Sequence, residues 1–181
     1  ETLSGIKKLK AYTSGGKVNR LRVDMGKAIL EPKEIPVVLD GDKVVDRPVE
    51  IAGKNYNITC VSMGNPHCVV FMDDIDNLDI ETVGPEFEND KLFPERVNTE
   101  FVTVLDDHTI KMRVWERGSG ETWACGTGAC AVAVAACENG FCKKGEDIKI
   151  KLKGGDLIIN YTDETVYMTG NAEKVFEGEV E

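Results

Sequence analysis

The segment Gly128–Glu138 constrains the fold most, because almost every residue in it is Ala, Val or Cys. This composition predicts a helix that is apolar all round, so other elements have to cover every side of it. Asn139 and Gly140 are typical of residues that end a helix. We therefore expect a buried helix, and a β-sheet wrapped around it is the simplest packing.

Most of the remaining chain shows the short alternating or β-branched runs of strands, separated by turn residues. We predict a hairpin within Ile6–Met25 and strands at Tyr56–Met63, Cys68–Met72, Phe101–Leu105, Ile110–Trp115, Ile148–Leu152, Leu157–Tyr161, Val166–Met168 and Lys174–Val180. A short helix is expected within Asn77–Phe87, and a mobile Gly-rich loop at Glu116–Thr122. The sequence predicts an α+β fold with a mixed or antiparallel, barrel-like sheet around one central helix.

The charge of the chain limits its partners. Its 181 residues carry a formal net charge of −10 at pH 7, and the pI is about 4.8. Nucleic acids and anionic membranes require a basic face, so we expect neither as a partner. The charged start, Glu1–Lys10, lacks the apolar core of a signal peptide, and a cytoplasmic location is expected.

Six cysteines lie in apolar surroundings: Cys60, Cys68, Cys125, Cys130, Cys137 and Cys142. This pattern suits reduced, buried thiols better than a disulfide scaffold. The spacing from Cys125 onward, C-x4-C-x6-C-x4-C, raises the alternative of a metal cluster. Thiolate sites usually come from turns, whereas two of these cysteines fall inside the predicted helix, so we expect no metal.

Cys125 stands where the buried helix begins and is followed by Gly126, Thr127 and Gly128. The first N–H groups of a helix have no partner within it and favour negative charge, which lowers the pKa of a thiol. The two glycines would also let a ligand carboxylate approach the backbone. The plainer alternative is that Cys125 is a small core residue, as Cys130 and Cys137 are expected to be.

Several longer motifs extend this pattern. They are Ser62–Cys68 (SMGNPHC), Phe93–Asn98 (FPERVN), Trp115–Thr122 (WERGSGET), Ala124–Cys130 (ACGTGAC) and Tyr167–Ala172 (YMTGNA). In this order, over nearly the whole chain, they closely resemble the diaminopimelate epimerase family. The resemblance implies an isomerase that inverts one α-carbon of LL-diaminopimelate to give the meso form, without pyridoxal phosphate or metal. Two cysteines on opposite faces of the carbon act as acid and base.

The resemblance implies that Cys125 is one member of this pair. Backbone N–H groups of Gly126 and Thr127 would bind the α-carboxylate and stabilise the charge that develops on deprotonation. His67 and Glu116 would tune the pKa of the thiol, and Glu116 would also contact the substrate's ammonium group.

Other residues are expected at the distal end of the substrate. Asn65 and Asn98 would form hydrogen bonds there, and Arg117 would pair with the distal carboxylate. Each has a structural alternative: Asn65 suits a turn before proline, Asn98 suits a strand start, Glu116 and Arg117 suit a solvated surface pair, and His67 suits a structural role beside a strand.

The chain departs from the family in one respect. The family's first half carries the second catalytic cysteine in a Cys-Gly-Asn-Gly motif, and this sequence contains no such motif. We therefore expect 26–170 to form the second domain, and 1–25 and 171–181 to be strands of a first domain supplied by the missing half. Such a chain would be inactive alone, and its open edges would favour a homodimer.

Three other functions stay open at this point. A proline racemase-like isomerase shares the Cys-Gly-Thr-Gly helix start, although proline has no distal group for Asn65, Asn98 and Arg117. A non-catalytic carboxylate-binding module needs only the helix start. A thiol hydrolase or transferase would use Cys125 as a nucleophile beside His67.

Overall fold

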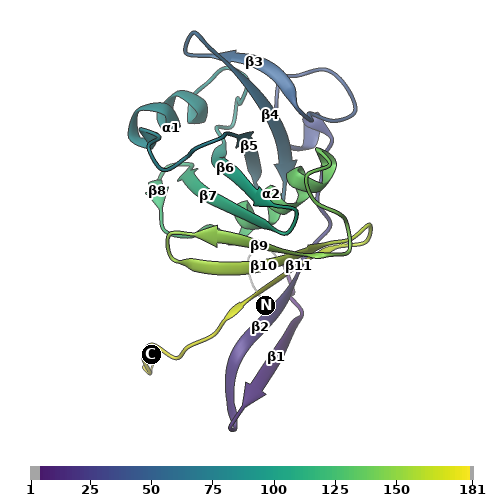
Figure 1. The fold of residues 1–181 in the computed structure, drawn as a ribbon, viewed down its shortest axis with the longest axis vertical. Coiled ribbons are helices and arrows are strands. Elements are labelled where there is room, and N and C mark those ends of the chain that lie inside the picture. Colours follow the sequence, from purple (N-terminus) through teal and green to yellow (C-terminus); the bar gives the residue numbers. More distant parts are fainter. Residues whose placement is uncertain (1–4, 180–181) are drawn as a thin grey trace.

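The computed structural model describes residues 5–179, which contain one eleven-stranded sheet and two α-helices (Figure 1). The strands are β1 Leu9–Ser14, β2 Lys17–Gly26, β3 Arg47–Ile51, β4 Lys54–Ser62, β5 Pro66–Phe71, β6 Asn98–Asp106, β7 Thr109–Glu116, β8 Gly120–Thr122, β9 Asp147–Leu152, β10 Gly155–Tyr161 and β11 Val166–Asn171. The helices are α1 Ile80–Glu88 and α2 Gly126–Glu138, with a 3-10 turn η1 at Pro32–Glu34.

The strands follow the order β1-β2-β11-β10-β9-β7-β6-β5-β4-β3, and β8 pairs with β7 beside this path. The pairs β5–β6 and β7–β9 are parallel, whereas the other pairs are antiparallel. The predicted mixed sheet with few helices is therefore confirmed. In the described part of the chain neither helix is long and apolar enough to cross a bilayer.

Helix α2 is enclosed as its composition predicted. Every residue from Gly128 to Ala136 is buried, and the helix contacts β4, β5, β6, β9, β10 and β11. It ends at Glu138, the C-cap Asn139 donates its side-chain amide to the Ala135 carbonyl, and Gly140 follows with φ +78°. An apolar helix of this kind has no stable exposed face, so burial rather than intrinsic propensity fixes its place.

The central strands β4, β5 and β6 bury side chains on both faces of the sheet. On β6, Val102 belongs to the core around α2, whereas Phe101 points to a second core. That second core includes Phe87 of α1, which packs edge-on against Phe101 and Tyr56. The period of two along each strand thus decides which side chains face α2.

The N-terminal hairpin was predicted correctly. Strands β1 and β2 turn at Gly15 and Gly16, both with positive φ, as a two-residue hairpin turn requires. The hairpin projects from the rest of the molecule, joined to it through the pairing of β2 with β11 (Figure 1). Residues 1–4 of the predicted first-domain segment lie outside the described residues.

Two expectations were wrong. The Gly-rich segment Glu116–Thr122 is a tight hairpin in which β8 pairs with β7, because Gly118 and Gly120 adopt positive φ and reverse the chain. The predicted strand Lys174–Val180 is absent from residues 174–179, and Val180 lies outside the described residues. In the described residues this segment pairs with no strand, and its alternating side chains gain no cover, since Phe176 is 83% exposed.

Candidate active site

Cys125 is the N-cap of helix α2. Its backbone is extended, with φ −133° and ψ 110°, and its Sγ accepts a hydrogen bond from the Gly128 N–H at 3.4 Å. The Thr127 Oγ1 lies 3.5 Å from the same sulfur. The residue is 6% exposed. The thiol therefore occupies the capping position, where the first-turn N–H groups of Gly126 and Thr127 have no helical acceptor.

The predicted lowering of the Cys125 pKa is wrong for this structure. Burial, followed by the nearby Glu100 carboxyl, raises the pKa of the thiol to about 12, and Glu116 adds in the same direction. Hydrogen bonds from Thr127 and from the Gly128 backbone lower the pKa, as expected of a helix start, but they are outweighed. Desolvation disfavours the thiolate more than the amides favour it.

Three predicted residues form a hydrogen-bonded chain to this thiol. The His67 Nε2 lies 3.0 Å from the Asn65 Oδ1, and the Asn65 Nδ2 donates to the Thr127 Oγ1 at 3.3 Å. The corner between β4 and β5 places Asn65, and the start of β5 places His67. His67 is fully buried. The structure thus brings Asn65, His67, Thr127 and Cys125 together.

Glu100 completes this chain, and the sequence analysis missed it. Its Oε1 lies 2.7 Å from the His67 Nδ1, and both side chains are fully buried. A Cβ on Gly128 would lie 2.6 Å from that oxygen, so this glycine allows the carboxyl to reach the helix start. The sequence alone offered no signal for Glu100, because the burial of Asn98–Val102 is evident only in the fold.

Asn98 and Arg117 lie together at a second corner. The Asn98 Nδ2 donates to the Pro66 carbonyl at 2.8 Å, and its Oδ1 accepts from the Arg117 backbone N–H at 3.0 Å. The Arg117 guanidinium donates to the Glu95 carbonyl through Nη1 at 2.9 Å. Asn98 therefore ties the strand start to the β7–β8 turn, while the guanidinium keeps further donors.

Glu116 stands at the end of β7, where its Oε1 accepts from the Thr122 hydroxyl. Its carboxyl contributes to the raised pKa values of both Cys125 and Glu100. Negative charge is thus concentrated near the thiol. A cationic group bound beside Glu116 would favour the thiolate.

A second glutamate missed by the sequence analysis, Glu88, supports the β7–β8 turn. Its Oε2 accepts from the Trp115 indole at 2.7 Å, and its Oε1 accepts from the Gly118 N–H at 2.9 Å and from Arg96 at 3.0 Å. Gly84 makes this possible, because a Cβ there would lie 2.3 Å from the Trp115 ring. Helix α1 therefore holds the turn that carries Arg117.

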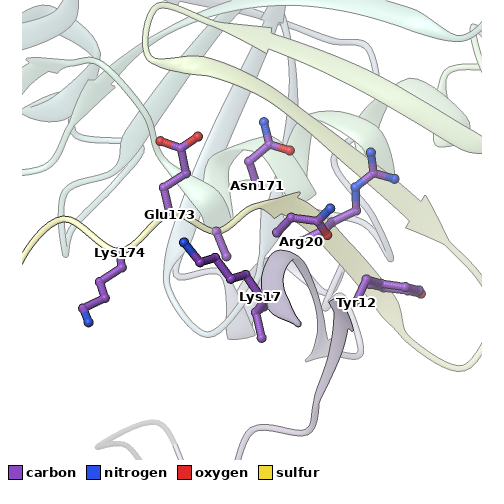
Figure 2. A pocket seen from close by; sticks show the side chains of 9 residues that line it. Tyr12, Lys17, Arg20, Asn171, Glu173 and Lys174 are labelled. Carbon is purple, nitrogen blue, oxygen red and sulfur yellow. The ribbon is translucent and has the colours of Figure 1, made fainter. Parts of the chain in front are cut away.

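A hollow of about 1220 Å³ lies elsewhere, between the β1–β2 hairpin and the segment after β11. Figure 2 shows the side chains of Tyr12, Lys17, Arg20, Asn171 and Glu173 around it. None of the predicted site residues lines this hollow. The hollow is therefore separate from the site around Cys125.

The fold is shared with solved racemase and epimerase structures. A probable proline racemase from Agrobacterium radiobacter superposes with a TM-score of 0.69 at 14% identity, over 93% of this chain and 55% of that one. A predicted epimerase from Pseudomonas aeruginosa gives a TM-score of 0.58 at 18% identity, over 94% of this chain and 64% of that one. At these identities the likeness defines the class of fold.

Sequence comparison defines the family. The diaminopimelate epimerase family model matches residues 59–175. The diaminopimelate epimerase of Acetivibrio thermocellus is 53% identical over all of this chain and 65% of its own length, and that of Methanococcus maripaludis strain C5 is 49% identical over the same shares. The chain belongs to the diaminopimelate epimerase family and spans about 65% of the length of these relatives.

Proposed function

We propose that this chain is the Cys125-bearing part of a cofactor-independent epimerase that interconverts LL- and meso-diaminopimelate. The observation that carries the proposal is the Cys125 sulfur at the N-cap of α2, in contact with the Gly128 N–H and with Thr127 at the end of the His67 chain. Membership of the family supplies the substrate. We assign Cys125 as one of two groups that exchange a proton with the α-carbon.

In the proposed reaction the Cys125 thiolate removes the α-proton while a thiol on the opposite face delivers another, and the reverse direction exchanges these roles. The N–H groups of Gly126 and Thr127 bind the α-carboxylate, and the positive end of the α2 dipole stabilises the charge that develops. With a pKa of about 12, only about one thiol in ten thousand is ionised at pH 8. The substrate's ammonium group beside Glu116 would lower this pKa and increase the thiolate population.

Asn65, Asn98 and Arg117 are proposed to bind the distal end of the substrate. The guanidinium uses Nη1 for the Glu95 carbonyl, so its remaining N–H groups are suited to a carboxylate. Asn98 has one amide hydrogen beyond its bond to Pro66. Proline has no distal group for these donors, which favours diaminopimelate over a proline racemase-like reaction or bare carboxylate binding.

The whole protein is proposed to contain a further half with the second cysteine. In this arrangement 26–170 form the domain in which a barrel-like sheet surrounds α2. The segments 1–25 and 171–181 are strands of the other domain. The apolar side chains of Leu9, Val18 and Phe176, exposed in this chain, support that division and also suit a homodimer. Six free cysteines agree with a reducing, cytoplasmic location.

The reaction is tested by following deuterium incorporation at the α-carbon of LL-diaminopimelate in D₂O, using this chain alone and joined to the family's first half. We expect exchange and inversion only in the joined protein, and loss of at least about a thousandfold in Cys125→Ala, because one acid–base group is removed. Turnover by this chain alone at the rate of the joined protein would contradict the two-cysteine proposal.

Substrate choice is tested by calorimetry of the joined protein with diaminopimelate and with proline. We expect heat with diaminopimelate only, and at least about tenfold weaker binding in Arg117→Ala, because one charged hydrogen-bonded contact is lost. Arg20→Ala on the exposed hairpin is the matched control. Equal binding of proline would instead favour the racemase-like alternative, and acylation of Cys125 by activated esters would favour a thiol transferase.

A further inference from the structure

The Glu100 carboxyl has no part in the function proposed above, yet it is the most deeply buried acid near the thiol. Its Oε1 lies 2.7 Å from the His67 Nδ1, and its Oε2 is buried without a hydrogen-bond partner among the described residues. An uncompensated charge in such a place costs several kcal/mol. The Glu100 and His67 side chains together should therefore be neutral, which requires one proton between Oε1 and Nδ1.

The atoms beyond His67 determine which group donates in each hydrogen bond between His67 and Cys125. The Asn65 Oδ1 faces the His67 Nε2 at 3.0 Å, and because an amide oxygen only accepts, Nε2 must carry a hydrogen. The Asn65 Nδ2 then donates to the Thr127 Oγ1 at 3.3 Å. Since Oγ1 accepts this bond, its own hydrogen is free to point at the Cys125 Sγ, 3.5 Å away.

We propose that Glu100 is a positioning residue: it shares one proton with His67, and this proton fixes the chain so that the Thr127 hydroxyl donates to the Cys125 sulfur. Whether the proton rests on Oε1 or on Nδ1, the other imidazole hydrogen stays on Nε2. If Glu100 and His67 lost the shared proton, the one hydrogen left on the imidazole would sit on Nδ1, facing the carboxylate. The Nε2 atom would then have no hydrogen and would become an acceptor. The Asn65 amide would then turn over, and Thr127 would donate to Asn65 instead of to the sulfur.

The groups around the pair favour retention of the proton. The neighbours that can ionise and that interact electrostatically with Glu100 are Glu116 on β7, Cys125 on α2 and the buried Cys68 on β5. Burial raises the pKa of the Glu100 carboxyl, and the Glu116 charge raises it further, although His67 opposes this. Every ionised form of these neighbours is negative, so a net negative charge on the Glu100–His67 pair is disfavoured.

The first test reads the His67 ring directly. The chain has only two histidines, and His108 is half-exposed, so His108→Gln assigns the ¹⁵N signals of the ring nitrogens. We expect the Nε2 of His67 to carry a hydrogen at pH 7, because it faces the Asn65 Oδ1, which can only accept. A His67 ring with a bare Nε2 at pH 7 would overturn the proposal.

The second test reads the sulfur. Iodoacetamide labelling of Cys125, resolved from the other cysteines by peptide mass spectrometry, is compared in Thr127→Val and Thr127→Ser between pH 7 and 10. We expect Thr127→Val to label about tenfold more slowly, because a hydrogen bond to the thiolate is lost, and Thr127→Ser to stay within about twofold. In a Glu100→Gln background the amide can turn either its oxygen or its NH₂ group toward the His67 Nδ1, so it no longer fixes the direction of the hydrogen bonds. There the slowing of labelling by Thr127→Val should fall below about threefold.

If Thr127→Val slowed Cys125 labelling equally in the wild-type and Glu100→Gln proteins, the proposal would also be overturned. Glu100 would then contribute only packing. Should Glu100→Gln fail to fold, the wild-type ring spectrum and the Thr127 pair decide. The inference rests on the proposed role of Cys125 as a thiolate, yet neither readout uses diaminopimelate. Loss of the proposed epimerisation in the deuterium assay would therefore leave these two results interpretable on their own.

Discussion

Glu88 and Glu100 are both buried acids that lie close to the candidate site, but they are treated very differently by their surroundings. Glu88 receives three hydrogen bonds, from the Trp115 indole, the Gly118 N–H and Arg96. Glu100 has one partner, His67, and leaves Oε2 without any in the described residues. The three hydrogen bonds of Glu88 fix neighbouring elements to one another, whereas a buried oxygen without a partner, such as the Glu100 Oε2, is uncommon and calls for an explanation.

The largest effect expected from this contrast is on folding. Glu88→Ala should lower the free energy of unfolding by about 3 kcal/mol, because the hydrogen bonds from the Trp115 indole, the Gly118 N–H and Arg96 are all lost. Glu100→Gln, which preserves shape and one hydrogen bond, should cost less than about 1 kcal/mol. Urea unfolding followed by tryptophan fluorescence measures both. A larger loss in Glu100→Gln than in Glu88→Ala would show that the roles are reversed.

The sequence predicted the secondary structure elements better than the buried acids beside the site. Helix α2, its glycine-flanked start with Cys125 and the β1–β2 hairpin follow from local composition, whereas Asn65 and His67 were predicted from the resemblance of their motif to the family. Glu100 and Glu88 could not be predicted locally, because their partners come from other elements. The parallel pairing of β5 with β6 sets His67 and Glu100 on one face, and a β7 tryptophan meets α1 only after the sheet forms. The raised thiol pKa was missed because it depends on that burial.

The two glycines after Cys125 should differ in the same way. Gly128→Ala places a Cβ 2.6 Å from the Glu100 Oε1 and 3.2 Å from the Cys125 Sγ, so we expect a loss of about 2 kcal/mol in stability and a disturbed His67 ring spectrum. Gly126→Ala meets only the flexible Met168 side chain, at 3.1 Å from its sulfur, and should cost less than about 1 kcal/mol. Thermal unfolding of the two variants compares them, and equal losses would contradict a specific need for Gly128 beside Glu100.

The smallest expected effect is on stability at alkaline pH, and it tests how apolar the core around α2 is, beside which Glu100 lies. Cys130 lies in the same core as Cys125, and burial raises its pKa from 9.0 to about 12. Because the pKa of the Cys130 thiol is higher in the folded than in the unfolded chain, the protonated thiol contributes to the free energy of unfolding. This contribution is complete below pH 9 and is lost as the pH rises from 9 to 12. Between pH 9 and 10 the wild-type chain should therefore lose about 1 kcal/mol more stability than Cys130→Ala, which has no thiol to ionise there.

Urea unfolding at these two pH values measures the difference, with Val132→Ala as a core control that keeps the thiol. If Cys130→Ala lost stability as steeply as the wild type, the environment around α2 would be more polar than its packing indicates, and the argument that Glu100 must share its proton with His67 would lose its electrostatic basis.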